Sequence, residues 1–577
     1  MWPLRRRQRG GEINPDEIFL DSSNLSSMDE TQFEGRVEFP INPLAITSVG
    51  AMFILATLIF LGQSFSLQIV HGEEYAEISR ENRIARSVIF APRGIIYDRN
   101  GTPLAWNEAP NTSATSTATS TQVYALRRYT ELPGLAHILG YVNYPRQDEA
   151  GNWWREDYAG VSGIEYTADA VLKGINGSLL IETDARGKKI REDMIVPPQT
   201  GSDQRLAIDA DVQSTLFSIL SKHAEANRFQ GGAAAIMDVR TGELLALTSF
   251  PEYDNTAFSD GDAVTIRAAN TNPRAPLLNR AISGVYTPGS IVKPLFAAAA
   301  LNEGIISPEK EILSTGQLVV PNPYFPDKPS IFRDWKAHGW VDMRGAIAVS
   351  SDVYFYTIGG GFQGQQGLGI SRLDSYARKF GLGQLTGIDL VGEEAGVIPT
   401  PEWKKEIFGE DEPWRIGDTY ITAIGQFGFQ ITVAQAVRFT AAIANGGTLV
   451  TPRVEQTPAS LLFQSESEEQ KIDILPSYLQ IAREGMRAAV SSSWESRTAR
   501  ALDMAGIEIA GKTGTAELGE RNQFMNSWVI GFWPASNPKY AFAVVLEKAP
   551  AGTLSGAAPA MRGFFEWLKQ NKPEYVN

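Results

Sequence analysis

The stretch GIEIAGKTGTAE, residues 506–517, decides between two folds for this chain. Its first eight residues fit the phosphate-loop pattern G-x-x-x-x-G-K-[ST], in which backbone N–H groups surround a nucleotide phosphate. A phosphate loop follows a strand and opens a helix, whereas residues 507–509 alternate apolar and polar like a strand that continues toward Lys512. Gly514 and Gly519 then make a poor helix start. We therefore interpret KTG as part of a strand and look for another reason for its lysine.

The composition is that of a globular protein that does not bind nucleic acid. The 577 residues are 43% hydrophobic and 10% aromatic, enough to bury a large core and to form more than one domain. The formal net charge of −14 argues against binding to nucleic-acid phosphates, which needs a concentrated basic surface. Cysteine is absent, so thiolate sites are excluded. Only four histidines occur, which disfavours a histidine-rich metal site. We expect neither a metal nor a cofactor.

A long uncharged segment predicts a membrane anchor. No formally charged residue occurs between Glu38 and Glu73, and the apolar run inside this interval is long enough to cross a bilayer. We predict a cytoplasmic polar tail at 1–43 and a transmembrane anchor at 44–70; a buried core helix is the alternative. Arginines within residues 5–9 favour a cytoplasmic N-terminus, although those within 80–86 oppose it. We place the tail inside and the rest of the chain outside.

The region after the anchor, up to about residue 200, predicts a β-rich domain. Short strand-like segments are separated there by turn signals, among them Asn100-Gly101 and Asn176-Gly177. A Ser/Thr-rich run at 111–122 predicts a flexible loop, with a glycosylated stalk as the alternative.

From about residue 201 the pattern is that of a compact α+β domain. Residues 231–250 and 526–548 each predict a hairpin of apolar strands. Between them, Thr432 and Gln435 have capping-box spacing at the start of a helix that Gly446 ends. Strands early and late, with helices between them, indicate a sheet that joins distant parts of the sequence.

Ser290 and Lys293 form an S-x-x-K element at the start of an alanine-rich segment that we predict to be a buried helix. Burial disfavours the charged form of a lysine, and a neutral amine beside a hydroxyl activates a serine nucleophile without histidine. An isolated match is weak, because the pattern recurs by chance and also describes a helix-capping serine followed by a surface lysine.

Two further elements strengthen this interpretation. Ser350 and Asp352 form an S-x-[ND] element that offers a hydroxyl to relay protons and a carboxylate to hold an amine, although alone it also fits a helix N-cap. Lys512 and Thr513 of the KTG element supply a cation and a hydroxyl that can grip a substrate carboxylate. Gly514 lets a substrate backbone lie against the strand. In the order S-x-x-K, S-x-[ND], KTG, the three elements match the signature of penicillin-recognising serine enzymes.

The chain resembles class B penicillin-binding proteins from the anchor onward. RGIIYDRNGTPLA (93–105) and YAGVSGIEYTADAVLKGING (158–177) are similar to the motifs of the family's membrane-proximal pedestal. FRDWKAHGWVDMRGAIAVSSDVYFY (332–356), TGIDL (386–390) and GDTYITAIGQFGFQITVAQ (417–435) resemble the elongation-type branch, which is paired with rod-shape SEDS glycosyltransferases. The resemblance implies an α+β penicillin-binding-protein transpeptidase fold, a central antiparallel sheet flanked by helices, with a β-rich pedestal and one transmembrane helix. It places a dimerisation-type pedestal at 71–200, with a shortened head, and the transpeptidase domain at 201–577.

The resemblance also implies D,D-transpeptidation of peptidoglycan stem peptides that end in D-alanyl-D-alanine, during cell-wall elongation, and acylation by β-lactams. The nucleophile would attack the carbonyl between the two D-alanines, and a SEDS-type glycosyltransferase would be the membrane partner. The implied residues are the catalytic Ser290, Lys293, Ser350 and Asp352, the substrate-binding Lys512, Thr513, Gly514 and Thr515, and the backbone N–H groups of Ser290 and Thr515 as oxyanion hole.

Other functions remain open on the sequence alone. A D,D-carboxypeptidase shares the three elements and differs only in letting water attack the acyl-enzyme. A β-lactamase would need a deacylating base, and the chain has no E-x-x-L-N element of the class A kind. A non-catalytic β-lactam sensor or polymerase scaffold is disfavoured by the intact motif residues and by the short tail, which leaves no room for a signalling domain.

Overall fold

The computed structural model describes residues 43–81, 84–109, 123–149, 151–183, 189–322, 324–457 and 470–576. The predicted polar tail, apart from residue 43, and the Ser/Thr-rich run at 111–122 lie outside these ranges. The chain divides into two compact units, one of Met1–Ala85 with Glu182–Ile190 and one of Arg86–Ile181 with Arg191–Asn577. The domain boundaries expected at residues 70 and 200 stay predictions.

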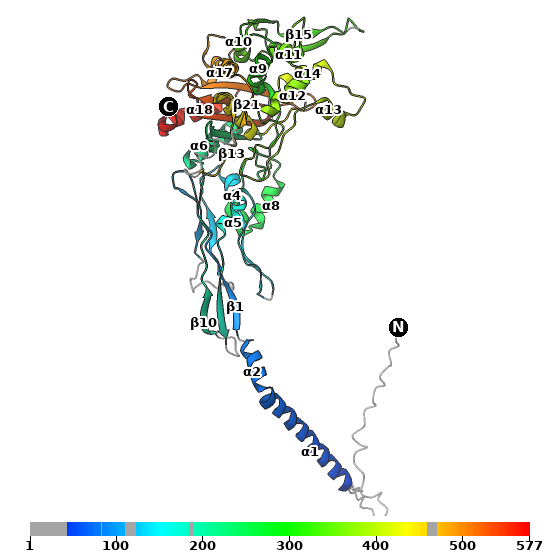
Figure 1. Cartoon of the computed structure of the whole chain (residues 1–577), viewed down its shortest axis with the longest axis vertical. Coiled ribbons are helices and arrows are strands. Elements are labelled where there is room, and N and C mark those ends of the chain that lie inside the picture. The colour runs from blue at the N-terminus through cyan, green and yellow to red at the C-terminus, as the bar shows by residue number, and fades with distance from the viewer. Residues whose placement is uncertain are drawn as a thin grey trace, which may run out of the picture. The chain divides into compact units, whose positions relative to one another are not determined.

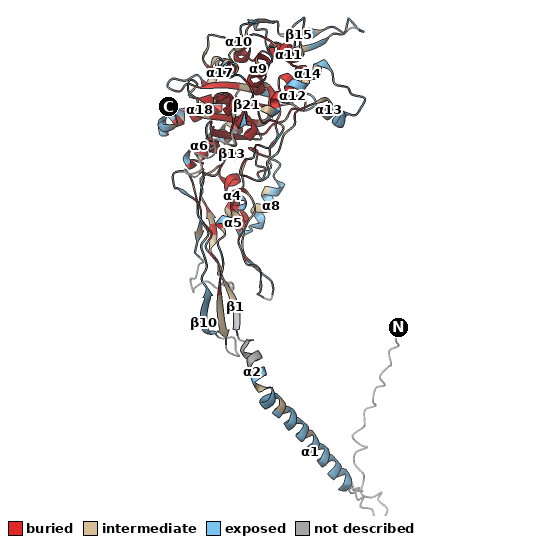
Figure 2. Ribbon diagram, viewed as in Figure 1, coloured by how far each residue is buried: buried red, intermediate tan, exposed pale blue. Residues whose placement is uncertain are grey.

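The first unit contains the apolar helix that the sequence predicted. Helix α1 (Pro43–Phe65) continues into a π-helical turn (Ser66–Val70), and α2 (Gly72–Glu81) follows. The span Pro43–Val70 has a mean hydropathy of 2.4 and none of it is buried, as its exposed colouring shows (Figure 2). A core helix would bury one face against the rest of the protein. Among the described residues, this is the single helix long and apolar enough to cross a membrane.

The second unit is built on a five-stranded antiparallel sheet that joins the two ends of the predicted transpeptidase domain (Figure 1). Its strands, in spatial order, are β13 (Leu244–Phe250), β12 (Gly231–Asp238), β22 (Tyr540–Pro550), β21 (Phe524–Trp533) and β20 (Ala510–Leu518). Both predicted hairpins are therefore confirmed. The predicted strand from residue 507 begins instead at Ala510, because Ile507 and Ile509 are buried in a segment that does not join the ladder.

Both faces of this sheet are buried, because side chains alternate along each strand and helices cover both sides. On β12, Ala233 and Ala235 belong to one apolar cluster while Ala234 and Ile236 belong to another. Helices α6 (Ala210–Ala226) and α18 (Ala557–Asn571) cover one face, and α15 (Val433–Ala444) and α17 (Pro476–Ser491) cover the other. The predicted capping box of Thr432 and Gln435 is present at the start of α15.

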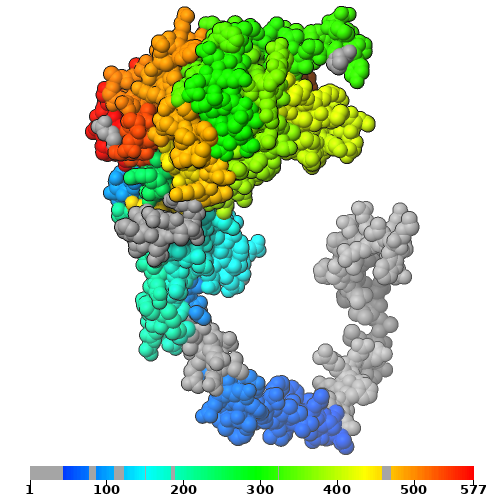
Figure 3. All heavy atoms as spheres, turned by 45° about the horizontal axis from the view of Figure 1, so that its top comes forward, coloured from blue at the N-terminus to red at the C-terminus, as the bar shows by residue number. Residues whose placement is uncertain are grey.

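The helices on the α15 side carry the first two motifs. A 3-10 turn (Gly289–Val292) leads into α9 (Lys293–Asn302), which is buried along almost its whole length. Helices α10 (Met343–Val349) and α11 (Asp352–Gly360) follow one another with two residues between them. In Figure 3 the green surface around residues 300–350 lies against the orange surface around residue 480, in keeping with the contact of α10 with α17. The other described α-helices between β13 and α15 in the chain are α7 (Asn255–Asp260), α8 (Ala263–Thr271), α12 (Ile370–Lys379), α13 (Pro401–Phe408) and α14 (Ile416–Ala423).

The region before residue 206 is rich in short strands, as the sequence predicted. A mixed sheet has the order β11 (Gln204–Arg205), β2 (Ile96–Tyr97), β3 (Pro103–Glu108), β4 (Leu126–Tyr129), and a second has the order β1 (Ile84–Ile89), β9 (Gly177–Thr183), β10 (Lys189–Val196). Short helices α3 (Ala136–Leu139), α4 (Gly163–Thr167) and α5 (Asp169–Leu172) pack beside them.

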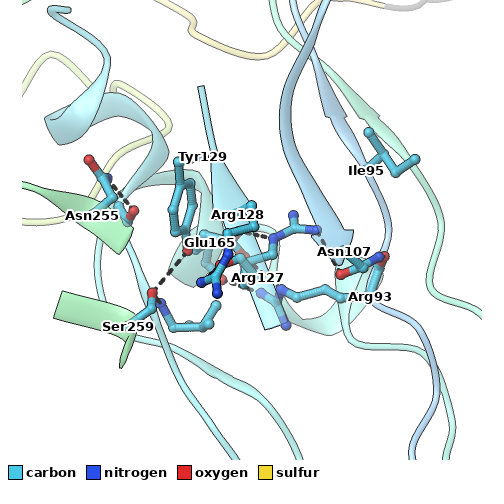
Figure 4. Close-up of polar contacts among 12 residues, drawn as sticks. Arg93, Ile95, Asn107, Arg127, Arg128, Tyr129, Glu165, Asn255 and Ser259 are labelled. Atoms are coloured by element: carbon cyan, nitrogen blue, oxygen red, sulfur yellow. Dashed lines mark hydrogen bonds and ion pairs between the residues drawn. The ribbon is translucent and has the colours of Figure 1, made fainter. Parts of the chain in front are cut away.

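A buried ion network joins β4, α4 and the segment that precedes β2 (Figure 4). The carboxylate of Glu165 accepts a hydrogen bond from Arg93 Nε at 2.5 Å and one from Arg127 Nε at 2.7 Å, and all three side chains are fully buried. A second carboxylate, Asp169, lies 2.8 Å from Arg93 Nη1. Breaking a buried pair is costly because the remaining partner keeps an uncompensated charge.

We predict that Glu165→Gln lowers the free energy of unfolding by about 3–5 kcal/mol, since it leaves two buried guanidinium groups short of one negative charge. The matched control is Glu108→Gln, which removes the 2.8 Å ion pair of the exposed Glu108 with Arg128 and should cost about 0–1 kcal/mol. Urea denaturation of both variants measures the difference. Equal losses in the two would contradict the network's role.

Candidate active site

The turn that carries Ser290 is packed directly against strand β20. Gly289 has a positive φ of 57°, and a Cβ on it would lie 2.5 Å from the Thr515 carbonyl oxygen. A Cβ on Gly514 would lie 2.8 Å from the Pro288 carbonyl oxygen. Glycine is needed at both positions because the backbones approach so closely. Gly514, predicted to make room for a substrate, thus also makes room for the turn that carries Ser290.

Lys293 is the first residue of α9, and its side chain is fully buried. Its ammonium group donates to the Ser350 carbonyl oxygen at 2.8 Å and to Asp352 Oδ1 at 2.6 Å, and it lies 3.3 Å from Ser350 Oγ. The face of the Phe355 ring lies 5.4 Å from Nζ. Among the described hydrogen bonds none joins Lys293 to Ser290, so in this structure the lysine faces the second motif rather than the serine three residues before it.

Ser350 is the residue on which the three motifs converge. It lies between α10 and α11 with φ 59° and ψ 42°, a left-handed conformation that is uncommon for a residue other than glycine. The ammonium of Lys512 donates to Ser350 Oγ at 2.8 Å and to the Thr513 carbonyl oxygen at 2.8 Å. Ser350 Oγ is therefore within reach of both buried lysines.

Burial and mutual repulsion shift the charges of this cluster. Burial lowers the pKa of Lys512 well below its usual value, the nearby Lys293 lowers it further, and Asp352 opposes the shift. Burial raises the pKa of Asp352 above 3.8; Lys293 opposes this rise and Asp334 adds to it. The site thus holds two amines and one close carboxylate in a medium that favours neutral forms, which suits the transfer of protons through Ser350.

The third motif lies on an accessible edge of the sheet. β20 is the terminal strand in the order of the five-stranded sheet. Thr515 is exposed and Thr513 is half-buried, whereas Lys512, Gly514 and Ala516 are buried. Since alternate residues share a face, the two threonines lie together on the more open side of the strand. Ser290 is itself only partly buried, so this serine and the threonines are accessible from solvent.

The sequence reasoning missed several residues that support this site. The backbone N–H of Gly289 donates to the Gly425 carbonyl oxygen at 2.9 Å, and Gln426 Nε2 donates to the Thr515 carbonyl oxygen at 3.4 Å. Gly425 and Gln426 lie in the segment GQFGF, whose only signal in the sequence is its resemblance to the family. Asp334 and Ser351 form buried contacts beside Ser350. In the described ranges, no group of three His, Cys, Asp or Glu side chains is arranged to hold a metal ion.

A comparison with protein-family models identifies this arrangement. Residues 232–566, more than half of the chain, match the penicillin binding protein transpeptidase domain, and residues 113–206 match the penicillin-binding protein dimerisation domain. The chain belongs to the penicillin-binding proteins. The predicted fold class is thereby confirmed, while the predicted bounds of the pedestal and of the transpeptidase domain stay predictions.

Individual relatives agree with the elongation-type branch. The chain is 30% identical over 596 residues to the peptidoglycan D,D-transpeptidase MrdA of Escherichia coli (strain K12), covering 87% of this chain and 90% of that protein. It is 33% identical to MrdA of Haemophilus influenzae over 481 residues, which is 78% of this chain and 70% of that protein. The predicted resemblance to class B, elongation-type penicillin-binding proteins is confirmed.

Solved structures show the same fold. Pseudomonas aeruginosa PBP2 in complex with WCK 5153 is 29% identical, with a TM-score of 0.65 over 85% of this chain and 100% of that one. The PBP2 of the Helicobacter pylori complex between PBP2 and MreC is 25% identical, with a TM-score of 0.66 over 85% and 99%. A chain of a peptidoglycan synthase complex described as coordinating polymerization and crosslinking has a TM-score of 0.67 at 26% identity, over 92% and 99%.

We predict that the rate of acylation by penicillin falls toward acid pH through the raised pKa of Asp352. Because that pKa lies above 3.8, the carboxylate takes up a proton where an ordinary aspartate is still ionised, and its ion pair with Lys293 is lost. Asp352→Asn has no carboxyl to protonate and should lack this acid limb. Stopped-flow acylation between about pH 4 and 8 measures it, with Asp374→Asn, which breaks an exposed pair with Arg378, as control. The prediction fails if Asp352→Asn keeps the wild-type limb.

Proposed function

We propose that this protein is a membrane-anchored peptidoglycan D,D-transpeptidase that crosslinks stem peptides through an acyl-enzyme on Ser290 and is acylated there by β-lactams. The observation that carries the proposal is the convergence of three sequence-distant motifs on Ser350, whose Oγ lies 3.3 Å from Lys293 Nζ and 2.8 Å from Lys512 Nζ. Relatives named for this activity, and a PBP2 neighbour in complex with WCK 5153, support it.

In the first half-reaction Ser290 Oγ attacks the carbonyl carbon between the two terminal D-alanines. Lys293 accepts the hydroxyl proton, and Asp352 positions this lysine. The backbone N–H groups of Ser290 and Thr515 stabilise the oxyanion that develops. The carbon–nitrogen bond then breaks, Ser350 passes a proton to the leaving amine, and D-alanine departs. The peptide remains bound to Ser290 as an ester.

In the second half-reaction an amine of a neighbouring stem peptide attacks the ester carbonyl. An amide bond forms, the ester bond breaks, and the proton lost by the amine returns to Ser290 Oγ through the same lysine and serine. Lys512, Thr513 and Thr515 hold the terminal carboxylate of the incoming substrate, and Gly514 keeps the strand surface flat there. The edge position of β20 allows an extended substrate backbone to lie alongside it.

The remaining parts of the chain extend this proposal. Residues 1–43 form a cytoplasmic tail, 44–70 an anchor in the cytoplasmic membrane, 71–200 a pedestal with a shortened head, and 201–577 the transpeptidase domain on the outer side. The apolar span Pro43–Val70 supports the anchor. A SEDS-type glycosyltransferase in the membrane is the proposed partner, in keeping with the similarity to a chain of a peptidoglycan synthase complex. Such a complex serves cell-wall elongation, the role of the branch that the chain most resembles.

A labelling experiment tests the proposal. Full-length protein in detergent micelles is incubated with a fluorescent penicillin, and mass spectrometry locates the adduct. We expect a stable adduct on Ser290 that is lost in Ser290→Ala, because the alanine variant has no nucleophilic oxygen. Ser283→Ala, which changes a partly exposed serine in the approach to the same turn, is the control and should label like the wild type. An adduct on another residue, or no adduct on folded wild-type protein, would overturn the proposal.

A further inference from the structure

A pair of residues outside the three motifs clamps the segment that carries Ser350. Asp334 and Trp335 follow strand β16 (Ser330–Arg333), in a short connection that returns to β17 (Gly339–Val341). Two backbone bonds fix this connection against the end of β14 (Ile312–Ser314) and the turn after it: Asp334 N–H donates to the Gly316 carbonyl oxygen at 2.9 Å, and His338 N–H donates to that of Ser314 at 3.0 Å. The connection is therefore held in place independently of α11.

The residues that Asp334 and Trp335 contact alternate along the chain with the site residues Ser350 and Asp352. Trp335 Nε1 donates to the Val349 carbonyl oxygen at 3.2 Å. Asp334 Oδ2 accepts from Ser351 Oγ at 2.9 Å and from the Val353 N–H at 3.1 Å. The clamp thus holds positions 349, 351 and 353, and the residues between them are Ser350 and Asp352. Each residue assigned to chemistry in this motif has a clamped neighbour on both sides.

This arrangement supports a backbone conformation that the chain would not adopt unaided. Ser350 is left-handed, a conformation that is strained for a residue with a Cβ. In that conformation its carbonyl oxygen lies 2.8 Å from Lys293 Nζ while its Oγ lies 2.8 Å from Lys512 Nζ. Such strain persists only when surrounding contacts fix it. The contacts of Asp334 and Trp335 with residues 349, 351 and 353 are among those that fix it.

The Asp334 carboxylate is suited to this task because it is both buried and ionised. Its side chain has no exposed surface. Burial raises the pKa of Asp334, but contact with His338, the Val353 N–H, the charge of Lys293 and the Ser351 hydroxyl together lower it to about 2. Ser314 Oγ donates to the same oxygen at 3.2 Å, and Ser351 Oγ also caps α11 through the Tyr354 N–H. The carboxylate therefore accepts strong hydrogen bonds.

We propose that Asp334 is a positioning residue for the transpeptidase reaction: with Trp335 it holds the segment 349–353 so that Ser350 faces both lysines and Asp352 faces Lys293. It touches no reacting atom and acts through Ser351 and the start of α11. The inference rests on the proposed function, since it assigns Asp334 a part in the acylation of Ser290. If Asp334 only stabilised α11, the same contacts would be present, but its substitution would leave the acylation rate constant per titratable site unchanged.

The test compares acylation kinetics of full-length variants with a penicillin, separating the dissociation constant of the initial complex from the acylation rate constant. Rates are normalised to the fraction of protein that titrates with the label. Asp334→Asn keeps the size of the side chain but replaces one acceptor oxygen by a donor. Ser351→Ala removes the facing hydroxyl and is the second variant if the first folds poorly. Asp254→Asn is the matched control, because Asp254 caps α7 through the Ala257 N–H far along the chain.

We expect Asp334→Asn to lower the acylation rate constant about 10- to 100-fold, the loss that a misplacement of roughly 1 Å produces. The dissociation constant should stay at its wild-type value, because the KTG strand is held separately. Ser351→Ala should act in the same direction, and the double variant should be no slower than Asp334→Asn alone, since both changes remove one contact. Asp254→Asn should match the wild type.

Three results would overturn the inference. One is a wild-type acylation rate constant per titratable site in both Asp334→Asn and Ser351→Ala, whatever their melting temperatures. Another is a change in the dissociation constant alone, which would assign Asp334 to substrate binding. The third is wild-type protein that is not acylated on Ser290, which removes the proposed function together with this inference.

Discussion

Among the described residues, Lys293 and Lys512 are both buried beside Ser350, and Asp352 is the one carboxylate that contacts this cluster directly. The site depends on stabilising these two amines away from water. An isolated ammonium in an apolar interior is costly, so each must be paired, hydrogen-bonded or neutral. Lys293 is paired with Asp352 at 2.6 Å. Among the described residues, Lys512 has only hydroxyl and carbonyl oxygens as hydrogen-bond acceptors, and burial lowers its pKa. The two similar side chains are thus stabilised differently, Lys293 by a carboxylate and Lys512 by uncharged oxygen atoms.

The fold follows from the need to bring three distant segments to this point. Lys293 starts a helix of the layer on the α15 side of the sheet, Ser350 lies at a reversal between two more helices, and Lys512 lies on the edge strand. Close packing of backbone on backbone, made possible by Gly289 and Gly514, brings the turn that carries Ser290 onto that strand. Strand β22 lies in the middle of the sheet, where it pairs with β12 on one side and with β21 on the other, and so joins the two ends of the domain. A change in any of these contacts moves one motif relative to the others.

Much of this could be predicted from the sequence, because the decisive signals were local. Alternating apolar residues predicted the two hairpins, and the capping box predicted the start of α15. The strand start was wrong because Ile507 and Ile509 are buried in an irregular segment, which gives the same alternation as a strand. The left-handed Ser350 had no signal, since nothing in the sequence marks a serine for positive φ. Asp334 was missed because its hydrogen-bond partners Ser314, Ser351 and Val353 lie 17 to 20 residues away in the chain. Its neighbours Trp335 and Lys336 are exposed, as in a surface loop.

The most direct test of the account is whether this cluster transfers an acyl group to an amine rather than to water. Full-length protein is incubated with a stem pentapeptide ending in D-alanyl-D-alanine and an isotopically labelled D-amino acid as acceptor, and the peptides are followed by mass spectrometry. The account predicts that the terminal D-alanine is exchanged for the labelled residue and that Ser290→Ala abolishes the exchange. Hydrolysis to the tetrapeptide alone, or exchange that survives in Ser290→Ala, would contradict it.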